Sequence, residues 1–323
     1  MKNLQGKTAI VTGGASGIGN GIAKALGRAG CNIVIIDARQ EAIDAALPFF
    51  ANKGYPAVGI QLDVTDRDGW EKTADTIEAR FGDIHILVNN AGVAAGSGKI
   101  WEGSYKDWDF ISGINIDGVY NGIHTIVPRI LKHGGEGHVV STSSTGGAFA
   151  VSGSGFYCTT KFAVAGMMEC LASDLEGTNI GASAFFPGPV NSNLGMSSAQ
   201  VRPDKYKDNK AAVTPPPEAG SSDEAPPPFA FMDFTKIFMT PEEVGERVVR
   251  GIRRNDLFIW THPEFKAGMA VRNKAIIEAF PDEPINENRA NSLKMFGTLT
   301  YNPVYESQTT PAAPDWPDVE ELL

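Results

Sequence analysis

Short apolar runs alternate with longer stretches of mixed character over the first 190 positions of the chain. The runs are rich in Ile and Val and bounded by Gly, Asp or Asn, which is typical of buried parallel strands. They cover residues 8–11, 33–36, 57–62, 84–88, 138–140 and 180–186. Segments of helical length lie between them, at 17–30, 40–53, 66–81, 105–133 and 157–176. This alternation predicts an α/β fold, a Rossmann-type doubly wound parallel sheet with helices on both faces.

The pattern changes after Phe186, where proline becomes frequent. The stretch 214–228 holds two proline triplets, and because proline lacks an N–H donor and disfavours helix in its predecessor, no regular structure is expected there. Thr240 is expected to cap a helix over 241–254, followed by a strand over 257–260 and a helix over 264–280. We expect a single domain over 1–323, with a substrate-binding lid inserted at 191–240 and a C-terminal extension at 262–323.

Composition separates the same two parts. Of 36 glycines, 31 lie in residues 1–195, whereas 15 of the 20 prolines follow, so turns and close backbone approaches belong to the first part. With 42% hydrophobic residues in the chain and no glycine period of three, the first part is neither fibrous nor disordered. The net charge of −10 is spread evenly without a basic face, which argues against nucleic acid or an anionic membrane as a partner.

Three further observations concern location and metals. No run of about 18 apolar residues is present, and the N-terminus lacks a secretory signal. Cys31, Cys158 and Cys170 have no metal-binding spacing and cannot all pair, which favours a reducing, cytoplasmic environment. The five histidines form no ligand pattern, so no metal site is expected.

A glycine-rich turn is the first candidate site. The first predicted strand ends in Thr12-Gly13-Gly14-Ala15-Ser16-Gly17-Ile18-Gly19, and a helix follows. Glycines let the backbone approach a pyrophosphate, which then sits at the helix N-terminus. The second strand ends in Asp37, at about the expected 20 residues, where a carboxylate binds ribose hydroxyls and repels the extra phosphate of NADP. Arg39 is expected to be a solvated residue of the second helix, so NAD is the expected cofactor.

Further motifs follow in a fixed order. They are Leu62-Asp63-Val64, Asn89-Asn90-Ala91-Gly92, Asn115, Ser144, Tyr157-x-x-x-Lys161 and Pro187-Gly188. Each is weak alone, but with the whole set in order the sequence resembles the short-chain dehydrogenase/reductase family, over roughly residues 5–195 and 241–261. The resemblance implies hydride transfer between an alcohol carbon and a nicotinamide.

The chemistry of the Tyr–Lys pair can be argued from the residues themselves. Tyr157 and Lys161 lie one helical turn apart on one face. A phenol with a pKa near 10 is a poor base at neutral pH, so we expect the Lys161 ammonium to lower the pKa of Tyr157, the general base. The resemblance implies that Ser144 holds the substrate oxygen and that Lys161 also binds the nicotinamide ribose. It further implies that Asn115 disturbs its helix and holds a water linked to Lys161.

The same resemblance implies a cofactor-binding set. Ile18 would pack near the nicotinamide, and Asp63 and Val64 would hold the adenine. The complete set is Gly13, Ser16, Gly17, Ile18, Gly19, Asp37, Asp63, Val64, Asn90, Gly92, Tyr157, Lys161, Pro187, Gly188, Val190 and Ser192. Ser192 replaces the family's usual threonine but keeps a hydroxyl for the carboxamide.

Substrate choice is implied to lie in the segment after Pro187-Gly188. Its aromatic and Met side chains suit a large, flat or aryl substrate, or equally pack the lid down or form a subunit contact. The expected substrate pocket is Ser144, Phe149, Phe156, Met196, Phe229 and Phe231. Asn191-Ser192-Asn193-Leu194, followed by Arg202-Pro203-x-Lys205-Tyr206, resembles the bacterial Cα-dehydrogenases of lignin β-aryl-ether breakdown, which oxidise benzylic secondary alcohols with NAD.

The sequence therefore predicts NAD-dependent oxidation of a bulky, aryl secondary alcohol to the ketone. The alternatives are an NADPH-dependent carbonyl reductase, a hydroxysteroid-type dehydrogenase, and a non-catalytic dinucleotide sensor. A sensor would normally have lost part of the Ser–Tyr–Lys set, which is complete here. The family resemblance also implies a homodimer or homotetramer that pairs through the long helices near 105–133 and 157–176.

Overall fold

A computed structural model describes residues 1–192, 194–207, 238–295, 302–308 and 310. Within these residues, seven parallel strands form one sheet in the order β3-β2-β1-β4-β5-β6-β7. They are β1 (Thr8–Thr12), β2 (Asn32–Asp37), β3 (Ala57–Gln61), β4 (Ile86–Asn89), β5 (Gly137–Thr142), β6 (Ile180–Phe186) and β7 (Phe258–Trp260). The predicted doubly wound parallel sheet is confirmed, with each strand within two residues of its expected bounds.

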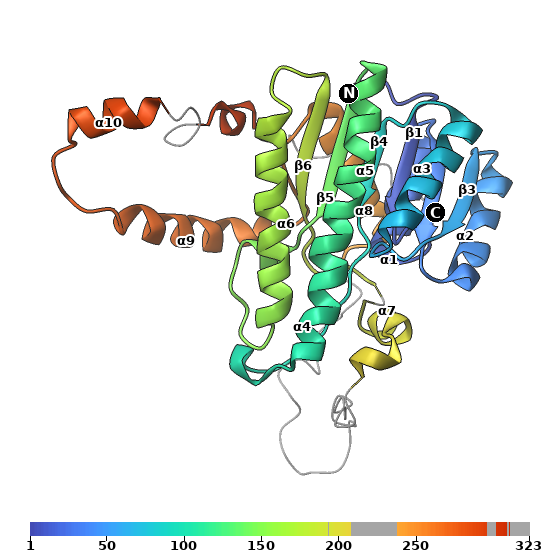
Figure 1. Cartoon of the computed structure of the whole chain (residues 1–323), viewed down its shortest axis with the longest axis horizontal. Coiled ribbons are helices and arrows are strands. Elements are labelled where there is room, and N and C mark those ends of the chain that lie inside the picture. The colour runs from blue at the N-terminus through green and yellow to red at the C-terminus, as the bar shows by residue number, and fades with distance from the viewer. Residues whose placement is uncertain (193, 208–237, 296–301, 309, 311–323) are drawn as a thin grey trace, which may run out of the picture.

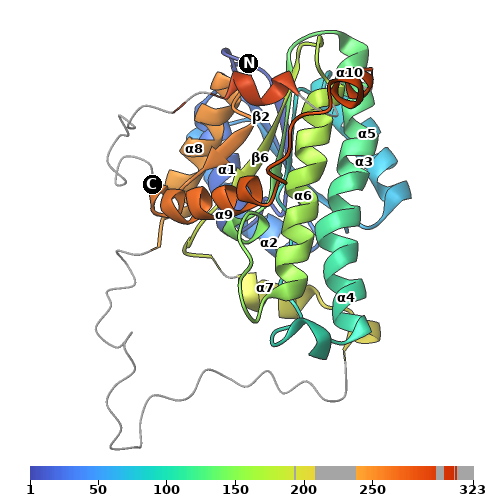
Figure 2. The ribbon, with the colours of Figure 1, turned by 90° about the vertical axis from the view of Figure 1, so that its left-hand side faces the viewer.

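Helices cover both faces of this sheet, as Figures 1 and 2 show. One face carries α1 (Gly17–Arg28), α2 (Gln40–Lys53) and α8 (Pro241–Arg254), and the other carries α3 (Arg67–Phe81), α5 (Gly118–His133) and α6 (Gly155–Asp174). In β1, Ala9 and Val11 join the first core, whereas Ile10 joins the second. Because successive strand residues point to opposite faces, a strand covered on both sides is apolar throughout, which is the pattern seen in the sequence.

Helices α1 and α8 pack closely through two glycines. A Cβ on Gly21 would lie 1.9 Å from the Pro241 carbonyl oxygen, and one on Gly245 would lie 2.3 Å from the Gly21 carbonyl oxygen. Helix α8 begins at the expected cap: Thr240 Oγ1 accepts from Glu243 N at 3.2 Å, and Glu243 Oε2 accepts from Thr240 N at 2.8 Å. This helix positions the turn that follows β6.

The long helix expected over 105–133 is interrupted. It consists of α4 (Tyr105–Ser112), a π-helical turn over Gly113–Asp117 and α5. Asn115 is buried at the centre of the turn. The interruption widens the helix at the position where the site needs a polar side chain.

The expected lid is described only at 191–192, 194–207 and 238–240. This part contains α7 (Leu194–Val201), which is attached to the body of the molecule at its end. Ser198 Oγ accepts from the Ala94 amide at 2.9 Å, and Arg202 forms a 2.6 Å ion pair with Asp107. The predicted pocket residues Phe229 and Phe231 lie outside the described residues, as does the proline-rich stretch.

The C-terminal extension leaves the body of the molecule. Helices α9 (Lys266–Glu278) and α10 (Glu287–Lys294) project sideways in Figure 1 and toward the viewer in Figure 2, and no residue of either is buried. The helix expected over 264–280 thus begins two residues late and ends two residues early. The segment 302–308 lies against α6 and β7, where Tyr305 hydrogen-bonds to Glu169 and stacks on Phe258. Residues 311–323 lie outside the described chain.

Candidate active site

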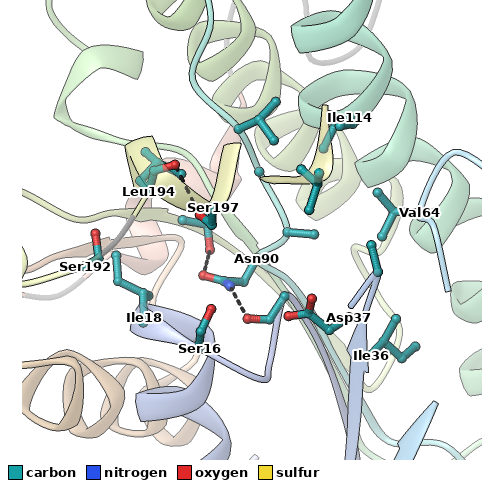
Figure 3. A pocket seen from close by; sticks show the side chains of 18 of the residues that line it. Ser16, Ile18, Ile36, Asp37, Val64, Asn90, Ile114, Ser192, Leu194 and Ser197 are labelled. Carbon is teal, nitrogen blue, oxygen red and sulfur yellow. Dashed lines mark hydrogen bonds between the residues drawn. The ribbon is translucent and has the colours of Figure 1, made fainter. Parts of the chain in front are cut away.

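A large pocket opens at the carboxyl ends of the strands, beside the point between β1 and β4 where the strand order reverses. In open α/β sheets this crevice is where ligands bind. The pocket encloses about 1130 Å³, part of it open to solvent. Figure 3 shows Ile36 and Val64 on one side of it and Leu194 and Ser197 on the other.

The glycine loop forms the floor of the pocket and leaves room for a phosphate. Gly13 and Gly17 have φ of +59° and +52°, which disfavour any side chain. A Cβ on Gly19 would lie 2.2 Å from the Gly13 carbonyl oxygen. Helix α1 starts at Gly17, so its free N–H groups are at the loop. These residues therefore fit the pyrophosphate of a dinucleotide.

Hydrogen bonds fix the loop to β4. Thr12 Oγ1 accepts from the backbone amides of Asn90 and Ala91 at 2.9 and 3.0 Å, and Asn90 Nδ2 donates to the Thr12 carbonyl at 3.1 Å. Asn90 and Gly92 line the pocket beside the loop, as expected. The adjoining strand ends are thus rigidly placed for a ligand that spans them.

Asp37 lies at the end of β2 and lines the pocket, but it is not alone there. Arg39 Nε donates to Asp37 Oδ1 at 3.2 Å, and the other guanidinium nitrogens donate to Ser16 Oγ and to Gln200 Oε1, each at 3.0 Å. The expectation of a solvated Arg39 is therefore wrong, because three partners from separate segments hold it at the pocket. The Asp37 carboxylate still faces the site and fits the ribose hydroxyls of NAD.

Asp63 and Val64 line the side of the pocket next to β2, together with Ile36 and Leu62. The Val64 carbonyl accepts from Trp70 Nε1 and from Asn121 Nδ2, each at 3.0 Å. These two bonds hold the segment after β3 against α3 and α5. The resulting apolar wall fits a flat adenine ring.

Tyr157 and Lys161 line the same pocket from α6. Lys161 is 4% exposed, and its ammonium donates to the Thr142 carbonyl at 2.8 Å while lying 5.6 Å from the centroid of the Tyr157 ring. Ser144 hydrogen-bonds to Tyr157 and accepts from the Gly146 amide at 3.1 Å. The structure therefore brings the Ser–Tyr–Lys set together, with Tyr157 and Lys161 in the lining of the pocket and Ser144 just behind it.

Burial governs the protonation of the pair. It raises the pKa of Tyr157 above the ordinary phenol value, although the hydrogen bond from Ser144 acts in the opposite direction. It lowers the pKa of Lys161 to about 8. The expected lowering of the Tyr157 pKa is therefore wrong for this geometry, since burial penalises the phenolate more than its neighbours favour it.

Asn115 holds the pocket wall through the π-helical turn. Its Oδ1 accepts from the Val93 amide at 2.8 Å, and its Nδ2 donates to the Val93 carbonyl at 3.0 Å and to Thr160 Oγ1 at 3.1 Å. A Cβ on Gly92 would approach both Asn115 Oδ1, at 3.3 Å, and Lys161 Nζ, at 3.4 Å. Asn115 therefore links the strand after β4 to α6 next to Lys161.

The turn after β6 lies beside the Ser–Tyr–Lys set, since the Thr145 amide donates to the Pro187 carbonyl at 3.1 Å. Pro187 and Ser192 line the pocket, whereas Gly188 and Val190 lie behind its surface. The Gly188 amide donates to Thr261 Oγ1 at 2.9 Å, and Val190 forms an isolated bridge with Met239. Gly188 and Val190 thus hold the turn in place through contacts on the side that faces away from the pocket.

Three residues of α7 that line the pocket were not predicted from the sequence. They are Leu194, Ser197 and Val201, at positions i, i+3 and i+7, which share one face of a helix. This spacing could have indicated a helix with one face toward the pocket, but the nearby proline-rich stretch argued against regular structure in this part of the chain. Helix α7 therefore covers the pocket from the side opposite β2.

The remaining expected substrate residues are dispersed. Phe156 packs on Trp108 with ring centroids 5.3 Å apart, and Phe149 packs on Trp260 and Phe265. Met196 is 64% exposed and is not among the residues that line the pocket. The structure brings neither Phe149 nor Phe156 into the lining of this pocket, so their contact with a substrate stays a prediction.

Two general findings concern the described part of the chain. No helix there combines the length and the apolar composition that a bilayer crossing requires. No three His, Cys, Asp or Glu side chains gather there in a way that could hold a metal ion.

Known proteins share this arrangement. Residues 7–202 match the model of a family described as short chain dehydrogenase. A Cα-dehydrogenase of Sphingobium sp. strain SYK-6 is 35% identical over 279 residues, 86% of this chain and 88% of the relative.

Two solved structures extend the comparison. LigO of the same strain, in its apo form, has a TM-score of 0.72 at 30% identity, with 93% of this chain and 99% of that chain covered. A short-chain dehydrogenase/reductase of Burkholderia phymatum, in complex with NAD, has a TM-score of 0.74 at 26% identity, with 88% and 100% covered. Fold, motifs and relatives agree: this chain is an oxidoreductase and belongs to the short-chain dehydrogenase family.

Proposed function

We propose that the protein oxidises a bulky, aryl (benzylic) secondary alcohol to the ketone with NAD as the hydride acceptor. The observation that carries the proposal is the meeting of Tyr157 and Lys161 with the glycine loop in one pocket. The name of the Sphingobium relative, Cα-dehydrogenase, supports an alcohol substrate of this class.

The residues that would hold NAD run along the pocket from β2 to the turn after β6. Asp37 would bind the adenosine ribose, Asp63 and Val64 the adenine, and the amides around Gly17 the pyrophosphate. Bound NAD supplies the acceptor for a hydride. The other members of the set are Gly13, Ser16, Ile18, Gly19, Asn90, Gly92, Tyr157, Lys161, Pro187, Gly188, Val190 and Ser192.

Tyr157 would take the hydroxyl proton while the carbinol carbon loses its hydride. The Ser144 hydroxyl holds the alcohol oxygen in line with the Tyr157 oxygen, since the two side chains are already hydrogen-bonded. Burial opposes the phenolate, so the Lys161 ammonium must favour it from its site beside Thr142. Asn115 keeps that ammonium in place through Thr160 and Val93.

Replacing Tyr157 with Phe tests the mechanism. We expect kcat to fall about 100- to 10,000-fold, because the proton has no other acceptor at that atom, while NADH binding changes less than about twofold. Steady-state kinetics and calorimetric titration with NADH measure the two. Tyr105→Phe, at a 90% exposed position of α4, is the matched control and should behave as wild type. Full turnover by Tyr157→Phe would exclude Tyr157 as the base.

A panel of alcohols tests the substrate class. We expect NADH formation with benzylic secondary alcohols and little with short aliphatic ones, since the pocket that helix α7 borders through Leu194, Ser197 and Val201 is large. Steroid alcohols belong in the panel, because a hydroxysteroid-type activity is the main alternative. A preference for NADPH and a ketone would instead indicate a carbonyl reductase.

The same proposal includes a lid over 191–240 and a self-associating enzyme. Helix α7, the first part of this lid, lies over the pocket, which is why we propose a lid here.

The expected subunit contact involves a face of mostly small side chains on α6, made of Ala163, Gly166, Met167 and Cys170. Nothing lies within 4 Å of a Cβ built on Gly166. A homodimer or homotetramer through α5 and α6 is therefore expected, and sedimentation velocity of the purified chain measures it.

A further inference from the structure

The turn after β6 is held from behind by two residues that no motif marks. Thr261 follows β7, is 1% exposed, and accepts the Gly188 amide at 2.9 Å through its Oγ1. The same Oγ1 lies 2.6 Å from His262 Nδ1. A chain of hydrogen bonds therefore runs from Gly188 through Thr261 to His262.

His262 also lies against Gly188 itself. A Cβ on Gly188 would be 2.5 Å from His262 Nδ1 and 2.7 Å from its Cγ. Only glycine fits here, because the imidazole occupies the space that a side chain would need. The ring and the turn are thus in direct contact, and a displaced ring would move the turn.

We propose that Thr261 and His262 are positioning residues that hold the Pro187–Gly188 turn for NAD, and that protonation of His262 weakens NAD binding. The inference rests on the proposed function, because the turn matters in this way only if the nicotinamide end of NAD lies beside it. Neither residue touches the reacting atoms.

Protonation of His262 is expected to weaken NAD binding because of which atoms donate and which accept in this chain of hydrogen bonds. Thr261 Oγ1 accepts from Gly188, so its single proton is free to go to a neutral His262 Nδ1. In the imidazolium, Nδ1 carries a proton of its own and no longer accepts. Thr261 is buried, so its hydroxyl proton would lose its acceptor, and this cost weakens the packing of Thr261 and His262 behind Gly188.

Several charged groups face His262. Glu264 is on its own turn, whereas Glu243 and Arg247 approach from α8. Burial lowers the pKa of His262, and Arg247 acts in the same direction, while Glu264, Glu243 and the Pro189 backbone act in the opposite one. The neutral ring is the form that the fold favours, which agrees with its role as an acceptor.

Paired substitutions test the proposal through NADH affinity, measured by calorimetry at a higher pH of about 8 and at a lower pH of about 4.5, well below the ordinary pKa of histidine. His262→Leu removes the acceptor, and we expect binding about tenfold weaker at both pH values, with kcat within about twofold of wild type. His262→Asn keeps an acceptor near the Nδ1 position but cannot titrate. It should bind as wild type at the higher pH and lose the weakening at the lower one.

Thr261 offers its own pair of variants. Thr261→Ser keeps the hydroxyl and should bind NADH as wild type, whereas Thr261→Val should bind about tenfold more weakly. The melting temperature of each variant reports whether it is folded. Wild-type affinity in His262→Leu, or an acid dependence that survives in His262→Asn, would overturn the inference. If NADH binding follows these expectations while no alcohol is oxidised, the proposed function fails and the positioning role stands.

Discussion

Asp37 and Arg39 share the edge of the pocket where an adenosine ribose would lie. The carboxylate compensates the guanidinium at 3.2 Å, and Ser16 and Gln200 fix the guanidinium in place. The charge next to the ribose is therefore balanced, and Asp37 supplies the part that repels a phosphate. We therefore expect the identity of the side chain at position 37 to influence the choice between NAD and NADP.

Replacing Asp37 with Ser should admit NADP. Removal of the carboxylate leaves Arg39 as a positive group already directed at the site, so we expect kcat/KM for NADP to rise about tenfold to a hundredfold and that for NAD to fall. Steady-state kinetics with both cofactors measure the change. Adding Arg39→Ala to the Asp37→Ser chain should cancel the gain; a gain that persists would mean that Arg39 does not bind the phosphate.

At the scale of the elements, the sequence predicts most of what the structure contains. The helix over 241–254 has its expected bounds and cap, because local capping chemistry and hydrophobic spacing decide both. The interruption at Gly113–Asp117 was suggested only by Asn115 and the family resemblance. Arg39 and its contact with α7 were not predicted as parts of the site, since Gln200, which joins them, is 161 positions from Arg39. Local rules cannot specify a contact of that separation.

The close contact between α1 and α8 leads us to predict how a substitution in it changes the stability of the fold. Gly245→Ala places a methyl 2.3 Å from the Gly21 carbonyl oxygen, a backbone atom that cannot yield without separating the helices. We expect a loss of about 1–3 kcal/mol in the free energy of unfolding, measured by chemical denaturation. Gly113→Ala is the control, because nothing lies within 4 Å of its Cβ and its φ is helical. Equal stability of the two variants would contradict the close packing.

At the scale of the whole molecule, a buried histidine contributes to the loss of stability in acid. His138 in β5 is fully buried, lies 2.8 Å from Ser183 Oγ through Nε2, and burial lowers its pKa to about 3. The unfolded chain takes up a proton at this residue below pH about 6.5, whereas the folded chain does not. Stability is therefore lost as the pH falls from about 6.5 toward 3, by up to about 1.4 kcal/mol per pH unit.

His138→Gln should remove this contribution. The Gln amide can donate to Ser183 as Nε2 does, but it does not titrate. We expect the wild type to lose more unfolding free energy than the variant between pH about 7 and about 5, as urea titrations would measure. Parallel losses in the two chains would show that His138 does not control acid stability.

The hydrogen bond from Gly188 to Thr261 joins residues 73 positions apart, and it gives the site an order of completion during synthesis. The phosphate cradle needs only the chain up to Ala91, because β4 pairs with β1 and the Thr12 hydroxyl accepts from the amides of Asn90 and Ala91. The Tyr–Lys helix follows, but the turn at Gly188 waits for β7, the last strand and an edge of the sheet. A nascent chain therefore contains the residues that bind a dinucleotide's phosphates before it contains those that place a nicotinamide, so a chain without β7 would be left with an incomplete site.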